Sequence, residues 1–95
     1  MIGEPTQISD IQVIKVSETT VKVTWKTNHL ATGKINYGFA EGEYEKELQN
    51  SKLSLDHEFE ITDLDPETRY HFEVMSHGKN YVYDANRSFI TNRLD

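Results

Sequence analysis

The stretch Leu64-Asp65-Pro66-Glu67-Thr68-Arg69-Tyr70 decides the fold of this chain. Proline suits the second position of a tight turn because its ring presets φ, and Tyr70 opens the alternating segment that follows. This order is typical of the corner of a β-sandwich, where a tyrosine ring packs in the core and its hydroxyl bonds to backbone a few residues upstream. We therefore predict two packed β-sheets, with Leu64, Pro66 and Tyr70 as structural core residues.

Hydrophobic and polar residues alternate in several short segments on both sides of this corner. The clearest is residues 21–27, where two valines and Trp25 share one face while Lys22, Thr24 and Lys26 share the other. A period of two predicts a half-buried antiparallel strand, with Trp25 in the middle of the core. Tyr37 is expected to point inward from the next strand. The other predicted strands are residues 11–16, 34–37, a short one within 40–54, 57–61, 70–77 and 87–91.

Seven short strands without a convincing helix predict an all-β fold, a seven-stranded immunoglobulin-like antiparallel β-sandwich. Ile11, Val13 and Val16 should face inward with a break in phase, as is typical of an edge strand. Residues 28–33 are expected to form a loop, and residues 81–86 should bridge to the last strand.

Residues 40–54 leave two interpretations open. Four glutamates recur at every second position from Glu41 to Glu47, which suits an exposed edge strand. Tyr44 and Leu48 lie four residues apart, which also suits one turn of helix. We favour a short strand plus a loop.

Length and composition limit the function. Ninety-five residues form one domain, residues 1–95 with a core of about 8–91, and the absence of cysteine excludes a disulfide or thiolate site. Ten basic and sixteen acidic residues give a net charge of −6, and residues 41–67 alone carry ten acids against two lysines. This charge argues against binding to nucleic acid and to anionic lipid surfaces. No apolar run approaches the ~20 residues that insertion into a membrane requires.

The titratable residues do not indicate a catalytic or metal site. His71 and His77 share a face but lie six residues apart on an extended strand, roughly 20 Å, so they cannot meet at one ion. Asp63 and Asp65 are better explained as turn formers than as calcium ligands, because nothing supplies the remaining oxygens. The sequence also lacks a nucleophile turn. We therefore expect no enzyme activity, no metal and no cofactor.

The segment Tyr81-Val82-Tyr83 is unusual because large side chains stand where a loop should be polar. Either one or two of them fold inward and extend the core, or they form an aromatic loop tip that binds a partner. In the second case Lys79, Tyr81, Tyr83 and Asp84 are the candidate contact residues of a loop from Gly78 to Asn86. Alternation should separate Val82 from its two neighbours.

The chain resembles a fibronectin type III domain over residues 8–91. The resemblance rests on five patterns: Ile11-x-Val13-x-x-Val16, Thr20-Val21-x-Val23-x-Trp25, Ile35-x-Tyr37, Leu64-x-Pro66-x-Thr68-x-Tyr70-x-Phe72-x-Val74 and Phe89-x-Thr91. The stretch from Trp25 to Gly38 is similar to prokaryotic members, which implies a module strung together in secreted or surface proteins, beside carbohydrate-active or phosphatase domains. The Arg-Gly-Asp of integrin-binding members is absent from the loop before the last strand.

This resemblance implies a non-catalytic spacer or protein-interaction module of a larger exported or cell-surface protein. Residues 1–5 do not read as a signal peptide, which by itself favours an intracellular protein, but we expect a domain of a larger exported chain. The alternative is an accessory domain of a secreted hydrolase that contacts polysaccharide through its aromatic loop. The partner is then a protein or a polysaccharide, and the isolated domain is expected to be a monomer.

Overall fold

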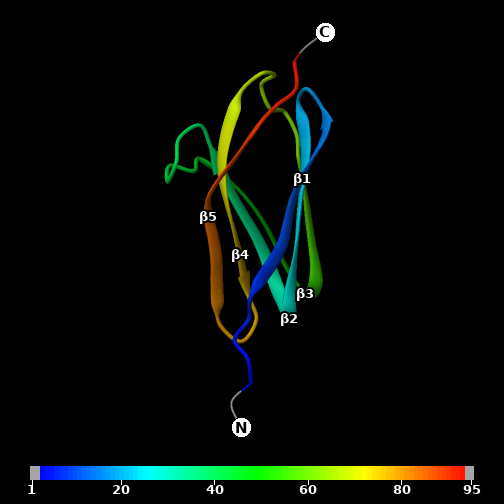
Figure 1. Ribbon diagram of the computed structural model, residues 1–95, viewed down its shortest axis with the longest axis vertical. Helices are drawn as coiled ribbons and strands as arrows, with labels where there is room; N and C mark the ends of the chain where they lie inside the picture. The colour runs from blue at the N-terminus through cyan, green and yellow to red at the C-terminus, as the bar shows by residue number, and fades with distance from the viewer. Residues whose placement is uncertain (1–2, 94–95) are drawn as a thin grey trace.

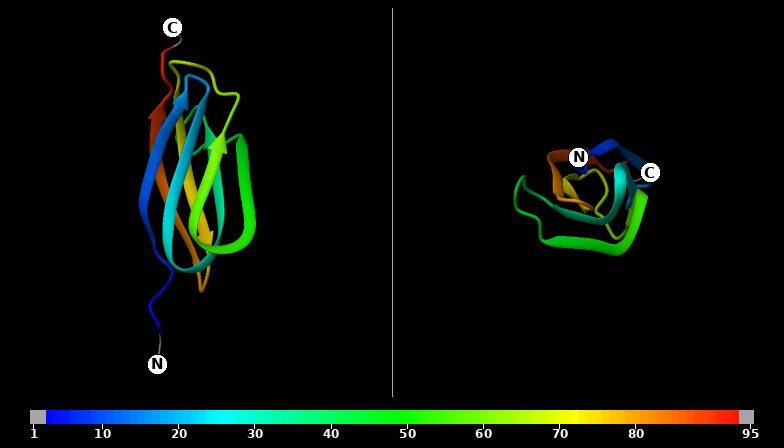
Figure 2. Two further views of the ribbon diagram at one scale, coloured as in Figure 1. Left: turned by 90° about the vertical axis from the view of Figure 1, so that its right-hand side faces the viewer. Right: turned by 90° about the horizontal axis from the view of Figure 1, so that it is seen from below.

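The computed structural model describes residues 3–93, which form antiparallel strands packed in two layers (Figures 1 and 2). One layer contains β1, the first half of β2 and the second half of β3; the other contains the remaining halves of β2 and β3 with β4 and β5. The all-β antiparallel sandwich is therefore confirmed. The strands are β1 (Ile8–Ser17), β2 (Thr20–Gly38), β3 (Lys46–Ile61), β4 (Arg69–His77) and β5 (Tyr81–Ile90).

The expected count of seven strands is wrong, because two pairs of predicted strands are continuous. The backbone of β2 stays extended through residues 28–33, so the loop predicted there does not form. Shifts of register between Lys26 and Ala31, and between Ala31 and Gly33, mark the bend that carries β2 from one layer to the other. β3 bends beside it. A bulged strand thus replaces a loop at this edge of the sandwich.

Residues 40–54 form a loop followed by a strand, as favoured from the alternation, and the alternative of a helical turn is wrong. The loop is held by a single bridge between Ala40 and Glu43, and Gly42 adopts a φ of 78°. β3 then begins at Lys46, and its Leu48 packs against the core from a half-buried position.

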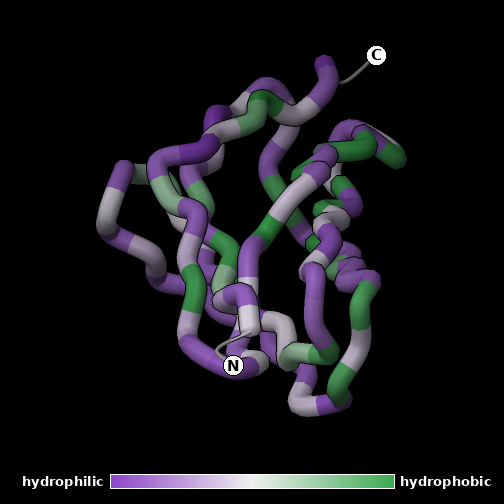
Figure 3. The backbone as a smooth tube through the Cα atoms, turned by 60° about the horizontal axis from the view of Figure 1, so that its bottom comes forward, coloured by the Kyte–Doolittle hydropathy of each residue, from purple (hydrophilic) through white to green (hydrophobic). Residues whose placement is uncertain are grey.

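The core is built around Trp25, which is 1% exposed. Its ring stacks on His57 and Phe59, with centroid distances of 5.3 and 5.5 Å. Its indole Nε1–H donates a 2.9 Å hydrogen bond to Oγ of Ser76 on β4, in the opposite layer. The alternation of hydrophobic and hydrophilic residues along the strands is visible in Figure 3. The remaining core residues are Val21, Val23, Ile35, Ile61, Leu64, Tyr70, Phe72, Val74 and Phe89.

The break in phase expected for the first strand is a bulge. Asp10 has a φ of 54°, and the register with β2 shifts between Ser9 and Gln12. Ile11 and Val13 pack against the core as expected, but Val16 is 53% exposed. The inward placement of Val16 is wrong because the register shifts again between Lys15 and Ser17.

The corner after β3 has the geometry that its sequence predicts. Tyr70 is 5% exposed, and its hydroxyl accepts a 2.7 Å hydrogen bond from the backbone N–H of Asp65. Leu64 is buried and donates its own N–H to the carbonyl of Thr19. Two of the expected core residues, Tyr37 and Pro66, are only half-buried.

Tyr70→Phe should keep the fold and lower the free energy of unfolding by about 1–3 kcal/mol, because the N–H of Asp65 loses its partner in a partly buried site. Denaturant melts measure this loss. Tyr83→Phe is the matched control, since Tyr83 is 60% exposed and its change should be close to zero. Equal midpoints for wild type and Tyr70→Phe would contradict a structural role of this hydroxyl.

His57 is a titratable group inside the sandwich. It is 7% exposed, stacks on Trp25, and places Nε2 3.0 Å from Oγ1 of Thr27. Burial lowers the pKa of His57 below its ordinary value of 6.5, although the Asp56 carboxylate and a backbone hydrogen bond at Ser54 partly oppose this effect. The folded state therefore favours neutral His57 more than the unfolded state does.

From this shift we expect a stability that falls with acid before the carboxylates titrate. The unfolded chain binds a proton at His57 at a higher pH than the folded chain does. The contribution is therefore complete above about pH 6.5 and is lost as the pH falls through that value toward the lowered folded pKa. Urea melts at pH 7.5 and 5.5 give the free energy of unfolding at each pH. The loss between the two pH values should be smaller for His57→Phe than for wild type. A difference that His57→Phe leaves unchanged would contradict the assignment to His57.

Candidate interaction surface

The hairpin of β4 and β5 carries the aromatic residues that the sequence singles out. Only residues 78–80 form its turn, and pairing resumes at once with His77 opposite Tyr81 and Met75 opposite Tyr83. The predicted loop from Gly78 to Asn86 is therefore wrong beyond its first three residues. The ladder with β4 pairs the backbone polar groups of this segment, which a longer loop would leave to water.

Both tyrosines point away from the core. Tyr81 and Tyr83 are each 60% exposed, whereas Val82 between them is half-buried. The separation of Val82 from its neighbours is confirmed. Of the three large residues, Val82 turns inward opposite the buried Ser76, and neither tyrosine extends the core. The rings of His77 and Tyr81 stack with centroids 3.8 Å apart and planes 4° apart. This cross-strand pair holds the Tyr81 ring in one orientation.

We call the surface formed by Met75, His77, Tyr81 and Tyr83 the tyrosine face. Its neighbours on β2 and β3 are polar: Lys34 stands opposite Met75 in the ladder, and its Nζ lies 3.1 Å from Oε1 of Glu47. Apolar rings bordered by such groups have the composition of a protein interface, with an aromatic centre and a polar rim.

The outer face of the other layer has a different character. Lysines of β2 stand opposite acids of β3: Lys22 pairs with Glu60, and Lys26 pairs with Asp56. Nζ of Lys26 lies 3.9 Å from Oδ1 of Asp56. Opposite charges in register stabilise a solvated sheet face. β1 adds the exposed Ile14 to that outer face, but the exposed aromatic rings of the hairpin favour the tyrosine face as the candidate surface.

The four predicted contact residues do not all lie together. Lys79 is exposed on the turn beside Tyr81, so it borders the tyrosine face. Asp84 is half-buried, at the alternate position along β5, and accepts hydrogen bonds of 2.6 and 3.1 Å from Arg87. These bonds raise the pKa of Arg87. Asp84 is therefore an intramolecular partner of Arg87 and does not join the tyrosines.

Within residues 3–93, no three histidine or acidic side chains gather where a metal ion could be held. The same part of the chain contains no helix that is long and apolar enough to cross a membrane.

A family model described as "Purple acid Phosphatase, N-terminal domain" matches residues 5–91. The chain belongs to this family. The match includes β1 to β5 and every residue of the tyrosine face. A search of curated protein sequences finds no match.

Solved structures place the chain among fibronectin type III folds, which confirms the resemblance. The FN1–FN3 domains of chicken CNTN1 match with a TM-score of 0.69 and 23% identity, over 94% of this chain and 33% of that one. The chain thus spans about a third of that structure. The fn3 domain of human contactin 1 matches with a TM-score of 0.72 and 16% identity, over 98% of this chain and 82% of that one. The sensor domain of the anti-sigma factor RsgI4 in Pseudobacteroides cellulosolvens matches with a TM-score of 0.62 and 17% identity, over 96% of this chain and 98% of that one.

These identities show the fold alone, so the case for a candidate interaction surface rests on the residues of this chain. Sequence reasoning missed Met75 and His77, although their outward direction follows from the alternation of residues 70–77. What sequence reasoning did not predict is that residues 81–86 pair with β4. With a turn at residues 78–80, that pairing places His77 opposite Tyr81.

Proposed function

We propose that this chain is a non-catalytic spacer and protein-interaction module of a larger exported or cell-surface protein. The observation that carries the proposal is the tyrosine face, where two tyrosines expose 60% of their surface on a rigid hairpin. Tyrosine offers a large, rigid contact area at a low entropic cost, which is why it is frequent among residues that dominate binding energy.

The shape of the domain supports the role of a spacer. Its extents are 55 × 23 × 19 Å, and the first and last described residues lie at opposite poles of the long axis (Figure 1). A module of this shape separates its neighbours by its full length. Termini at opposite poles also suit a linear array of domains.

The segment before β1 is held in a fixed direction, which makes the spacer rigid at that pole. Thr6 is 2% exposed; its N–H donates to Oδ1 of Asn80 at 2.8 Å, and its Oγ1 accepts from the N–H of Lys79 at 2.9 Å. Asn28 bonds to the backbone of both Pro5 and Gln7, at 3.0 and 2.7 Å. A chain entering along this segment therefore has a defined orientation.

The family description names the N-terminal domain of a phosphatase, which is one part of a larger enzyme. We accordingly place the chain beside a separate catalytic domain. The alternative, an accessory domain that contacts polysaccharide, is favoured by one observation: exposed tyrosine rings can also stack on sugar rings.

The tyrosine face is tested by photo-crosslinking in the full-length protein in its own cells. With p-benzoylphenylalanine in place of Tyr81, we expect an adduct that contains a second polypeptide or another domain of the same protein. The same residue in place of Ile14 is the matched control, because Ile14 is 47% exposed on the outer face of β1. Equal adducts from both positions, or none from position 81, would contradict the proposal.

A double variant separates contact from structure. Tyr81→Ser with Tyr83→Ser should leave the melting temperature nearly unchanged, with a shift below the ~4–8 °C that ~1 kcal/mol produces in a domain of this size, since both rings are exposed. A larger fall would show that the tyrosines are structural. Retardation of the wild type in gels containing soluble polysaccharide, lost in the double variant, would support the alternative instead.

The purified chain should not hydrolyse p-nitrophenyl phosphate. The motivation is the lack of a nucleophile motif in the sequence and of a metal-holding group among the described residues. Turnover above the buffer rate that a single histidine or glutamate substitution abolishes would refute the non-catalytic role.

A further inference from the structure

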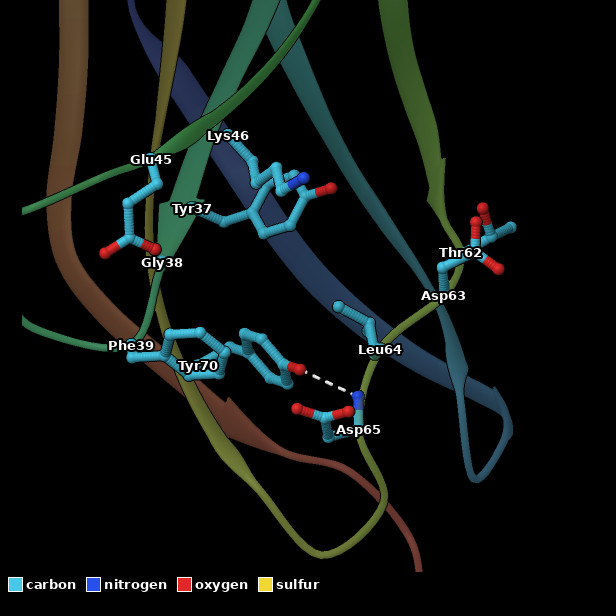
Figure 4. A pocket seen from close by; sticks show the side chains of 10 residues that line it. All are labelled: Tyr37, Gly38, Phe39, Glu45, Lys46, Thr62, Asp63, Leu64, Asp65 and Tyr70. Atoms are coloured by element: carbon cyan, nitrogen blue, oxygen red, sulfur yellow. Dashed lines mark hydrogen bonds between the residues drawn. The ribbon is translucent and has the colours of Figure 1, made fainter.

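A half-open cavity of about 250 Å³ lies where β2 ends, between the following loop and the Tyr70 corner (Figure 4). Its aromatic walls are Tyr37, Phe39 and Tyr70. Phe39 is 56% exposed, and its ring centroid lies 5.2 Å from that of Tyr70. A phenylalanine laid on the corner tyrosine in this way leaves aromatic surface open to solvent.

The polar lining of this cavity is mainly acidic. Glu45, Asp63 and Asp65 contribute three carboxylates, against the single ammonium of Lys46, so the lining carries a formal charge of −2. All four side chains belong to exposed residues. Burial raises the pKa of Tyr37, and Tyr70 and the Asp63 carboxylate add to the rise. The Asp63 carboxylate therefore acts electrostatically on Tyr37, one of the aromatic walls.

Lys46 brings a cation to the same side of the cavity as Tyr37. The two residues stand opposite each other in the ladder of β2 and β3, and both side chains line the cavity (Figure 4). The carboxylate of Asp65 lies on the other side of the cavity, beside the hydroxyl end of Tyr70, and the Phe39 ring lies beyond Tyr70 (Figure 4). Among the described residues no ion pair joins Lys46 or Asp65 to another side chain.

We propose that this cavity binds an arginine side chain of a partner protein. A planar guanidinium stacks on aromatic faces and donates hydrogen bonds to carboxylates at its edge, which matches the two kinds of lining. Lysine offers only a compact point charge without a stacking plane. The proposal does not rest on the tyrosine face, which lies at the other end of β4, so either can fail alone.

The test is an NMR titration of the chain with the peptide acetyl-Gly-Arg-Gly-amide. We expect saturable shifts of backbone amide resonances centred on Phe39, Asp65 and Tyr70. The same peptide with citrulline in place of arginine keeps the shape and loses the charge, and it should bind about tenfold more weakly or less, as expected where ionised hydrogen bonds are lost. Equal binding of the two peptides, or shifts centred elsewhere, would overturn the proposal.

Matched charge variants separate a local site from the general acidity of the chain. Glu45→Gln with Asp65→Asn should weaken arginine-peptide binding about tenfold. Glu4→Gln with Glu58→Gln removes the same charge from exposed residues outside the lining and away from the loop of residues 39–45. It should change the affinity less than about twofold because salt screens distant charges. Equal losses in the two double variants would leave no role for the cavity.

The aromatic wall is tested by Phe39→Leu, which keeps an apolar contact with Tyr70 and removes the ring. The arginine peptide should bind about two- to fivefold more weakly, as expected for the loss of an exposed cation–π contact. The citrulline peptide should show no corresponding change. An unchanged affinity for the arginine peptide would overturn the stacking part of the proposal.

Discussion

The hydrogen bond from the Trp25 indole to Ser76 links the two layers of the sandwich through two buried polar groups. Each would be costly to bury alone, so each fixes the position of the other. Because Ser76 must point inward, its neighbours Met75 and His77 must point outward. The constraint that closes the core therefore also selects the residues of β4 that reach the tyrosine face.

The turn at residues 78–80 connects β4 to β5 and also contacts the segment before β1, so it positions both relative to β4. A Cβ at Gly78 would lie 2.7 Å from Oγ1 of Thr6 and 2.9 Å from the carbonyl oxygen of Leu30, so only glycine allows this close approach. The next two residues of the turn bond to Thr6. One short turn thus sets the hairpin register that pairs Tyr81 with His77 and also anchors the incoming chain.

The sequence predicts what depends on local chemistry. A proline turn followed by an alternating tyrosine strand is enough for the corner, and the inward positions of β4 follow from a period of two. The bends of β2 and β3 are not predictable in this way, because residues 28–33 contain turn-forming residues yet remain extended between two ladders. Pairing partners distant in the sequence decide that outcome.

The candidate surface shows the same division. Alternation alone separates Tyr81 and Tyr83 from Val82. The position of the two tyrosines on a strand depends on the register between β4 and β5. The hydrogen bonds from Arg87 to Asp84 depend on the bulge at Asn86, whose φ is 63°. Neither is encoded in a short window of residue types.

β4 connects the two proposed contact sites, because His77 at its end belongs to the tyrosine face and Tyr70 near its start lines the arginine cavity. The inward residues of this strand are buried in the core, so its ends cannot move independently without disrupting that packing. Contacts at both ends of a rigid strand would fix the geometry of two neighbours relative to each other. A spacer with this property would set orientation as well as distance, and the rigid core and the exposed rings at both ends of β4 are what such a role requires.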